Sequence, residues 1–243
     1  MSRFYGPTSI LSGLALVFIV GCGSPETVPR YTPSFEYTPP KESKQGAADV
    51  TFAIVGARYP TSIPLFQRFG QSVSRDFLGI LTARGYTVKG PFATHDEMTF
   101  PDKKGSDLVL IPELQINRNA SIKWSQGFGA AVMGAVSLQG EGDIVITGRV
   151  DLVVAESLSK EKMWTKSINI PPITIHVVTT KTYSRPLSAD ELVINEGMVY
   201  DDVAKALDAQ YKAILEKSYQ YLDPEEMRIV KKQAQEIRSK KVY

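Results

Sequence analysis

The residue with the most distinctive chemistry in this 243-residue chain is Cys22, its only cysteine. It follows a short apolar stretch that runs from Ile10 to Gly21, downstream of the basic Arg3. This stretch is too short to cross a bilayer core, which requires about 20 residues. A basic start, a short apolar stretch and a small residue at its exit are typical of a secretory signal, so residues 1–21 are predicted to be a signal peptide.

Residues 19–22, Ile-Val-Gly-Cys, resemble the lipobox of bacterial lipoproteins. In lipoproteins the leader is cut before the cysteine, whose thiol then carries lipid. A lone cysteine in an exported protein cannot form an intramolecular disulfide, which agrees with this use; the alternative is a general secretory leader followed by an incidental free thiol. The resemblance implies that Cys22 is lipidated and connects the protein to a membrane. Bacterial lipoproteins with an aspartate directly after this cysteine tend to stay in the inner membrane. This chain has Gly23 at that position, so the resemblance favours the outer membrane, at its cell-surface or periplasmic face.

Few side chains suggest catalysis or metal binding. The only histidines are His95 and His176, and a single cysteine excludes zinc sites built from Cys and His. His95 beside Asp96 and Glu97 could be a general base, but a solvated loop is the plainer interpretation. His176 lies in an alternating β-rich stretch, which favours a partly buried structural histidine. We predict no catalytic residue, no metal site and no enzyme activity.

Composition limits the partners. Lys and Arg total 28 against 26 Asp and Glu, so the chain without its leader is close to neutral. Near-neutrality argues against nucleic-acid binding, which needs several cations on one face. The glycines of residues 127–129 do not open a helix after a strand, so they are not a dinucleotide fingerprint and no cofactor is predicted.

Residues 22–48 are predicted to be a lipidated cysteine followed by a Pro-rich tether, and residues 49–243 a single α+β domain. Prolines of this density favour an extended chain of about 3.1 Å per residue. Phe35 and Tyr37 could dock on the domain, but isolated aromatic residues in a linker are more often exposed. The prolines of the tether are Pro25, Pro29, Pro33, Pro39 and Pro40.

The domain is predicted to open with a strand, a helix and a second strand. Residues 50–55 alternate and are rich in β-formers. From Leu65, apolar residues recur every three or four positions until Arg84 and Gly85, which is typical of an amphipathic helix and its end. Residues 86–89 then return as a strand, giving a βαβ-like unit.

A long apolar strand is predicted at residues 107–116. Its first half is apolar at every position, as in a strand covered on both faces, and its second half alternates. Pro112 indicates a bulge or a sheet edge. Residues 117–124 are polar, and residues 127–136 form either a close-packed strand or an apolar loop.

A hairpin is predicted from residues 144–154 and 163–170, ended by Pro171 and Pro172. Residues 173–180 are a further β-rich stretch or an extended arm. Two helices follow, one from Tyr200 and one capped by Asp223. The predicted fold is α+β, with a mainly antiparallel sheet covered by one long N-terminal helix and two C-terminal helices.

Several stretches, in order along the chain, resemble the neuraminyllactose-binding haemagglutinin family of bacterial surface lipoproteins. They are the lipobox cysteine, residues 85–88, residues 96–100 with Lys103 and Lys104, the strand from Leu108, residues 202–207 and the Lys-rich last helix. Proteins of this family are described as adhesins that bind sialylated glycans, with a basic binding segment soon after the central strand.

The corresponding stretch here is residues 117–123. It keeps Arg118 and Lys123 but lacks the paired basic residues of the family segment. The resemblance therefore implies ligand binding at Arg118 and Lys123; the alternative is a strand-to-strand loop with two surface cations.

These observations predict an outer-membrane-anchored, non-catalytic lipoprotein, and the resemblance implies an adhesin for sialylated glycans. An alternative is a periplasm-facing lipoprotein of envelope assembly that binds a protein or lipid partner. The apolar residues 127–136 motivate this alternative, because exposed apolar patches often mark partner sites. A hydrolase would require a cleft with carboxylates converging around His95 or elsewhere.

Overall fold

The structure is a computed structural model of the chain. It describes residues 30–40, 43, 46–59, 63–126, 137–182 and 199–240. The chain divides into two units, Met1–Arg30 and Tyr31–Tyr243. The predicted signal peptide, Cys22 and the apolar residues 127–136 lie outside the described residues, and the second unit is the one described below.

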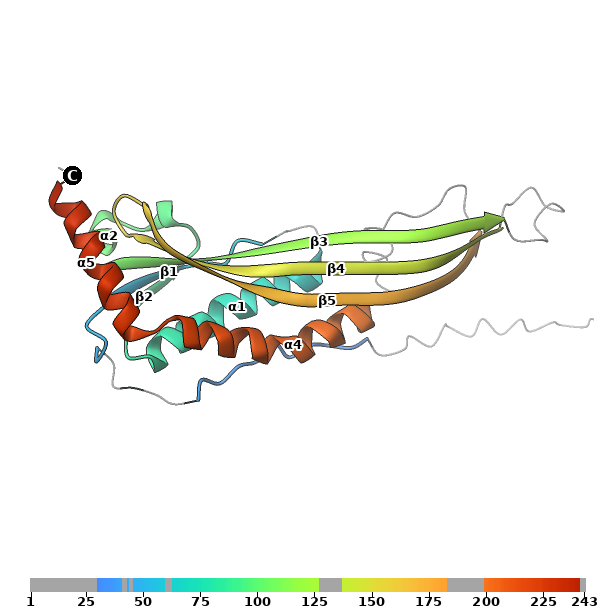
Figure 1. Cartoon of the computed structure of the whole chain (residues 1–243), viewed down its shortest axis with the longest axis horizontal. Helices are drawn as coiled ribbons and strands as arrows, with labels where there is room; N and C mark the ends of the chain where they lie inside the picture. The colour runs from blue at the N-terminus through green and yellow to red at the C-terminus, as the bar shows by residue number, and fades with distance from the viewer. Residues whose placement is uncertain are drawn as a thin grey trace, which may run out of the picture. The chain divides into compact units, whose positions relative to one another are not determined.

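A five-stranded sheet in the order β2-β1-β3-β4-β5 forms the centre of this unit (Figure 1). The short strand β1 (Thr51–Val55) pairs in parallel with β2 (Thr87–Phe92) and with the start of β3 (Leu108–Gln126). The long strands β3, β4 (Ser137–Glu156) and β5 (Lys162–Thr182) are antiparallel. The predicted α+β fold with a mainly antiparallel sheet is confirmed.

The predicted helices are also confirmed. The helices α1 (Pro64–Ala83) and α4 (Tyr200–Tyr221) pack on one face of the sheet, and α5 (Pro224–Lys240) lies at the end where β1 and β2 are found (Figure 1). Asp223 caps α5 as predicted, because its Oδ1 accepts hydrogen bonds from the N–H groups of Glu225 and Glu226 at 3.0 and 3.3 Å.

Two regions of the sheet differ in what covers them. One region, here called the base, is where β1 lies between β2 and the start of β3. Residues 108–111 of β3 are all less than 5% exposed there. Leu108 and Leu110 face the helices, whereas Val109 and Ile111 pack with Met98 in the connection between β2 and β3, which also holds the short helices η1 (His95–Glu97) and α2 (Phe100–Lys104). This confirms that the first half of the strand is covered on both faces.

The other region is the arm, formed by residues 117–126, 137–147 and 173–182. Residues 117–124, which the loop alternative placed between strands, belong to β3 and pair continuously with β4 as far as Gln126. Polar side chains suit a strand here because β4 pairs with one edge of β3 while one face of the sheet remains in water. Pro112 causes no bulge in this pairing; it lies just beyond Leu110, the last β3 residue paired with β1.

The prediction that Pro171 and Pro172 end the hairpin is wrong. β5 runs through both prolines, and the pairing register shifts there between Ile146 and Gly148 of β4. Proline is tolerated at this point because β5 is at the edge of the sheet and the shift is a β-bulge, so the missing N–H groups remove no regular ladder bond.

Residues 31–40, here called the strap, pack against α1 and α4. Phe35 is fully buried, and its ring lies 5.2 Å from that of Phe69 and 5.4 Å from that of Tyr211. The Asp208 carboxylate on α4 accepts hydrogen bonds from the Phe35 N–H at 2.9 Å and from the Tyr31 hydroxyl at 2.5 Å.

The strap corrects the prediction for this part of the chain. Phe35 is buried and Tyr37 is half-buried, so the exposed aromatic residues expected of a linker are not found. An aromatic cluster between two helices supplies the partner that the sequence of the segment alone could not reveal. The packed unit begins at Tyr31, well before residue 49.

Candidate functional site

His95 is not on a solvated loop, so that prediction is wrong. Its side chain is 5% exposed, and its Nε2 lies 2.8 Å from the carbonyl oxygen of Ser157 in the turn between β4 and β5. Nδ1 lies 3.6 Å from the Asp96 carboxylate. A general base must reach the proton of a substrate, whereas this ring is enclosed and bound to a backbone carbonyl, so His95 serves to hold the β2–β3 connection against the turn.

A buried ion pair lies beside His95 and was not foreseen. The Glu156 carboxylate is fully buried and lies 2.5 Å from the Arg238 Nε of α5. Burial raises the pKa of the Glu156 carboxyl, but hydrogen bonds from the N–H groups of Ser159 and Leu158 and from Arg238 outweigh it and hold that pKa below its usual value. Arg238 also donates to the carbonyl oxygen of Ser106, so the pair fastens α5 to the base of the sheet.

Arg118 and Lys123 do not form a common site. Successive side chains of a strand point to opposite faces, and the β3–β4 pairing between these residues is unbroken. Arg118 therefore shares the helix-facing side with Leu114 and Ile122, where it is half-buried, and Lys123 is exposed on the opposite side, here called the outer face.

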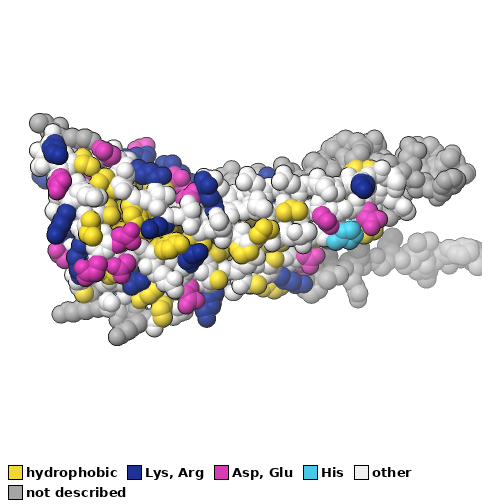
Figure 2. Space-filling model, in the orientation of Figure 1, with side chains coloured by type: hydrophobic (Ala, Val, Ile, Leu, Met, Phe, Trp, Pro, Cys, Tyr) yellow, Lys and Arg dark blue, Asp and Glu magenta, His cyan; other side chains and the backbone are white. Residues whose placement is uncertain are grey.

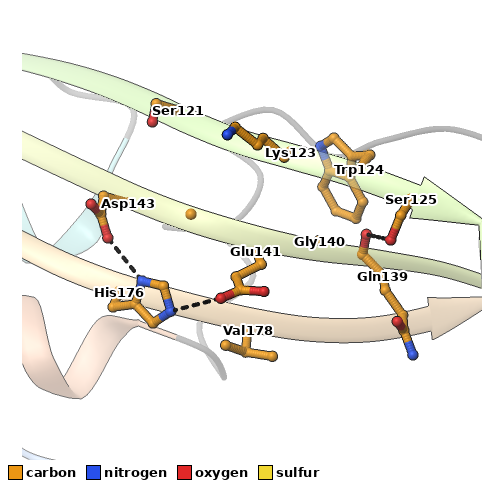
Figure 3. A pocket seen from close by; sticks show the side chains of 11 residues that line it. Ser121, Lys123, Trp124, Ser125, Gln139, Gly140, Glu141, Asp143, His176 and Val178 are labelled. Atoms are coloured by element: carbon orange, nitrogen blue, oxygen red, sulfur yellow. Dashed lines mark hydrogen bonds and ion pairs between the residues drawn. The ribbon is translucent and has the colours of Figure 1, made fainter.

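The outer face of the arm carries a groove of about 600 Å³ that is open to solvent (Figure 3). The strand pairing determines its floor: Lys123 of β3 lies opposite Glu141 of β4, which lies opposite Val178 of β5. The residues that line it are Ser121, Lys123, Trp124, Ser125, Gln139, Gly140, Glu141, Gly142, Asp143, His176 and Val178.

The second row of the groove is Ser121, Asp143 and His176. His176 Nδ1 lies 2.9 Å from Asp143 Oδ1, and Nε2 lies 3.7 Å from Glu141 Oε1, so the imidazole sits between two carboxylates (Figure 3). Its side chain is 58% exposed, which contradicts the predicted partly buried histidine. The neighbours Ile175 and Val177 face the helices instead.

This row has the residue types of a Ser-His-Asp triad but not its order. In a triad the histidine lies between the acid and the serine, because it must take the proton of the nucleophile. Here Asp143 is paired with both Ser121 and His176 and lies between them. His176 has carboxylate neighbours on both ring nitrogens, so it cannot activate Ser121, and the groove is suited to binding.

The aromatic ring of Trp124 lies against Gly140 of β4, since a Cβ added to Gly140 would meet this ring at 2.7 Å. Polar and charged side chains make up most of the other residues that line the groove. Figure 2 shows a histidine among acidic side chains near the end of the arm.

Sequence reasoning missed Glu141 and Asp143. Their spacing of two residues in an alternating strand was a usable signal that they share a face. Placing His176 between them required the register of β5, which shifts twice between the hairpin turn and the groove.

In the part of the chain that the structure describes, no helix is long and apolar enough to cross a membrane. No group of three or more His, Cys, Asp or Glu side chains within these residues is arranged to hold a metal ion.

Comparison with known proteins finds similarity in three-dimensional structure but not in sequence. No protein-family model matches the chain, and no curated protein matches it in sequence. Its structure is similar to that of a Helicobacter pylori protein described as a homologue of neuraminyllactose-binding haemagglutinin, with a TM-score of 0.57 and 14% identity over 85% of this chain and 100% of that chain.

Weaker similarities are found to a Xanthomonas campestris protein and to a lipoprotein from Neisseria meningitidis. The first has a TM-score of 0.35 and 9% identity over 86% of this chain and 99% of that chain. The second has a TM-score of 0.25 and 12% identity over 64% of this chain and 99% of that chain. At these TM-scores the two structures do not establish a common fold with this chain. The chain shares its fold with the Helicobacter pylori protein.

Proposed function

We propose that this chain is a non-catalytic lipoprotein of the bacterial envelope, anchored in the outer membrane by lipid on Cys22. The observation that carries the proposal is the short apolar stretch that ends in Ile-Val-Gly-Cys, with no second cysteine to form a disulfide. The fold shared with the haemagglutinin homologue is compatible with it.

The strap makes the anchor short. Only residues 23–30 separate Cys22 from Tyr31, where packing begins. A chain spans at most about 3.6 Å per residue, so this connection reaches roughly 30 Å. A lipid on Cys22 would thus keep the folded unit close to the membrane surface, within reach of envelope or surface ligands.

Lipid labelling in cells tests the proposal. Cells that express the full chain are fed an alkyne analogue of palmitate, and the protein is examined for the label and for its presence in the outer-membrane fraction. Cys22→Ser should lose the label, because the thiol that carries the lipid is gone. Ser24→Ala, two residues away, is the matched control and should be labelled as the parent is. A Cys22→Ser protein that is still labelled would show that the proposal is wrong.

The groove on the outer face favours glycan binding as the activity of the anchored protein. Glycans offer many hydroxyl groups, and the groove presents hydroxyl, amide, carboxylate and imidazole groups of Ser121, Gln139, Glu141 and His176 in regular rows. An open groove on a rigid sheet suits a chain-like ligand better than an enclosed small molecule.

A glycan array probed with the full chain in detergent tests this activity. We expect binding that His176→Ala weakens, since its imidazole lies in the middle of the groove and is exposed. Asp202→Asn, an exposed position on α4, is the control and should bind as the parent does. An array on which the protein binds nothing would remove the glycan proposal.

Binding of a protein or lipid partner in envelope assembly is the alternative, and its motivation, residues 127–136, lies outside the described residues. Protease treatment of intact cells separates the two. An adhesin at the cell surface is cleaved, whereas a subunit facing the periplasm is shielded until the outer membrane is opened.

A further inference from the structure

The charges in the groove decide which sugars it can accept. Lys123 contributes one positive charge, and Glu141 and Asp143 contribute two negative charges. The two carboxylates lie two residues apart on β4, at the centre of the three strands, whereas Lys123 lies on β3 to one side. A ligand that rests on the floor of the groove therefore meets carboxylates first.

A sialylated glycan is a poor match for this arrangement. Its carboxylate would approach Glu141 and Asp143, and like charges that are brought together oppose binding. Arg118, the arginine that the sequence offered for a sialate, is on the other face of the sheet. An arginine fork is the usual partner of a carboxylate, and the lining residues of the groove include none.

We infer that the groove binds glycans with free amino groups, such as oligomers of glucosamine, and discriminates against sialylated glycans. The inference rests on the glycan binding proposed above and names its ligand class. Glu141 and Asp143 accept hydrogen bonds from the ammonium of the amino sugar, while Ser121, Ser125 and Gln139 bond to its hydroxyl groups.

The position of His176 supports this assignment. The imidazole lies between the two carboxylates, 2.9 Å from Asp143 and 3.7 Å from Glu141, and leaves each of them partly free. Asp143 is 50% exposed and Glu141 is 73% exposed, so both retain oxygen atoms that a ligand can reach (Figure 3). The imidazole thus fixes the positions of the Asp143 and Glu141 carboxylates and leaves their exposed oxygen atoms accessible to a ligand.

Three oligosaccharides of equal length test the inference by calorimetry with the full chain in detergent. The probes are a glucosamine oligomer, its N-acetylated counterpart and a sialylated oligosaccharide. We expect the glucosamine oligomer to bind most tightly and the sialylated one most weakly. Glu141→Gln with Asp143→Asn should weaken binding of the glucosamine oligomer about ten-fold, as is typical when charge-assisted hydrogen bonds become neutral ones, and should change binding of the acetylated oligomer little.

The outcomes separate this inference from the proposal on which it rests. If the sialylated oligosaccharide binds as well as the glucosamine oligomer, the inference is overturned and glycan binding stands. The same holds if the double substitution leaves the preference for the amine unchanged. If none of the three binds, and the array shows no other ligand, glycan binding fails and the inference fails with it. Asp202→Asn again serves as the control for a loss of negative charge elsewhere.

Discussion

The base and the arm of the sheet are built from the same strands, but they are covered differently. In the base, residues 108–111 of β3 are buried on both faces, by the helices on one side and by the β2–β3 connection on the other. In the arm the same strand has half-buried residues such as Ile122 toward the helices and exposed residues such as Ser121 and Lys123 on the outer face.

This difference separates a part of β3 that stabilises the fold from a part that is available to bind a ligand. In a stretch of strand that is covered on both faces, every side chain is buried. None can change without loss of packing, because protein interiors are as dense as organic crystals. A position on the outer face of the arm is free of that constraint, so its side chain can be selected for a ligand. The predictions below test whether stability is concentrated in the base and binding in the arm.

The largest expected effect is the loss of a leucine from the base. Leu110→Ala removes a fully buried side chain between β1 and β4 and should lower the free energy of unfolding by about 3 kcal/mol. Ile122→Ala, on the same face of the same strand in the arm, should cost roughly 1 kcal/mol, because its side chain is only partly buried. Urea denaturation of the two variants measures both values, and equal costs would contradict the division between base and arm.

The next effect comes from the ion pair that fastens α5 to the base. Glu156→Gln keeps the shape of the side chain but removes its charge, and should cost about 1–3 kcal/mol near neutral pH through weaker hydrogen bonds with Arg238 and the turn. The folded state lowers the pKa of Glu156, so the stability that the carboxylate contributes is present above its unfolded value of about 4.3 and is lost as the pH falls through the folded value.

The stability difference between parent and Glu156→Gln should therefore shrink as the pH is lowered from about 7 to about 3. Urea denaturation across this range measures it. The substitution Asp202→Asn, at an exposed carboxylate on α4, should show no comparable trend. A difference for Glu156→Gln that stays constant over the range would mean that its charge contributes nothing to the base.

Much of the base could be predicted from sequence because its signals are local. The three- and four-residue spacing of apolar residues from Leu65 predicts α1, and the N-cap at Asp223 predicts the start of α5. Along β3, the change from continuous to alternating apolar residues indicates where the strand stops being covered on both faces. These patterns arise from the geometry of a single element, so they can be recognised without knowing which other elements it packs against.

The candidate site could not be predicted because it depends on register. Asp143 and His176 face each other only after two shifts in the β4–β5 pairing, one near the hairpin turn and one at Pro171 and Pro172. Each shift changes which residue of β4 lies opposite a given residue of β5, so the pairing of His176 with Asp143 could not be predicted from the alternation along β5 alone. The burial of Phe35 was missed for a related reason, since its partners Phe69 and Tyr211 come from distant helices.

A glycine in the arm provides the third test. A Cβ at Gly142 would fall well inside contact distance of the Ser121 backbone, so Gly142→Ala must push β3 and β4 apart and should cost about 1–2 kcal/mol. Gly79 in α1 has nothing within 4 Å of such a Cβ, and Gly79→Ala should instead stabilise the protein by roughly 0.5–1 kcal/mol, since alanine favours the helix. Thermal unfolding of both variants shows whether the sign differs, and a Gly142→Ala protein as stable as the parent would mean that the arm pairs more loosely than its register indicates.

The smallest expected effect on stability belongs to the groove. Glu141→Gln and Asp143→Asn change exposed side chains on the outer face, and each should alter the free energy of unfolding by less than about 0.5 kcal/mol, as surface substitutions usually do. Thermal unfolding at neutral pH measures this. A loss of 2 kcal/mol or more, about the size of a lost buried contact, would show that the carboxylates hold the arm together and are not free to meet a ligand. A null effect on stability, combined with altered sugar binding, is the result that assigns the outer face of the arm to recognition, since the carboxylates would then contribute to binding and not to the packing of the base.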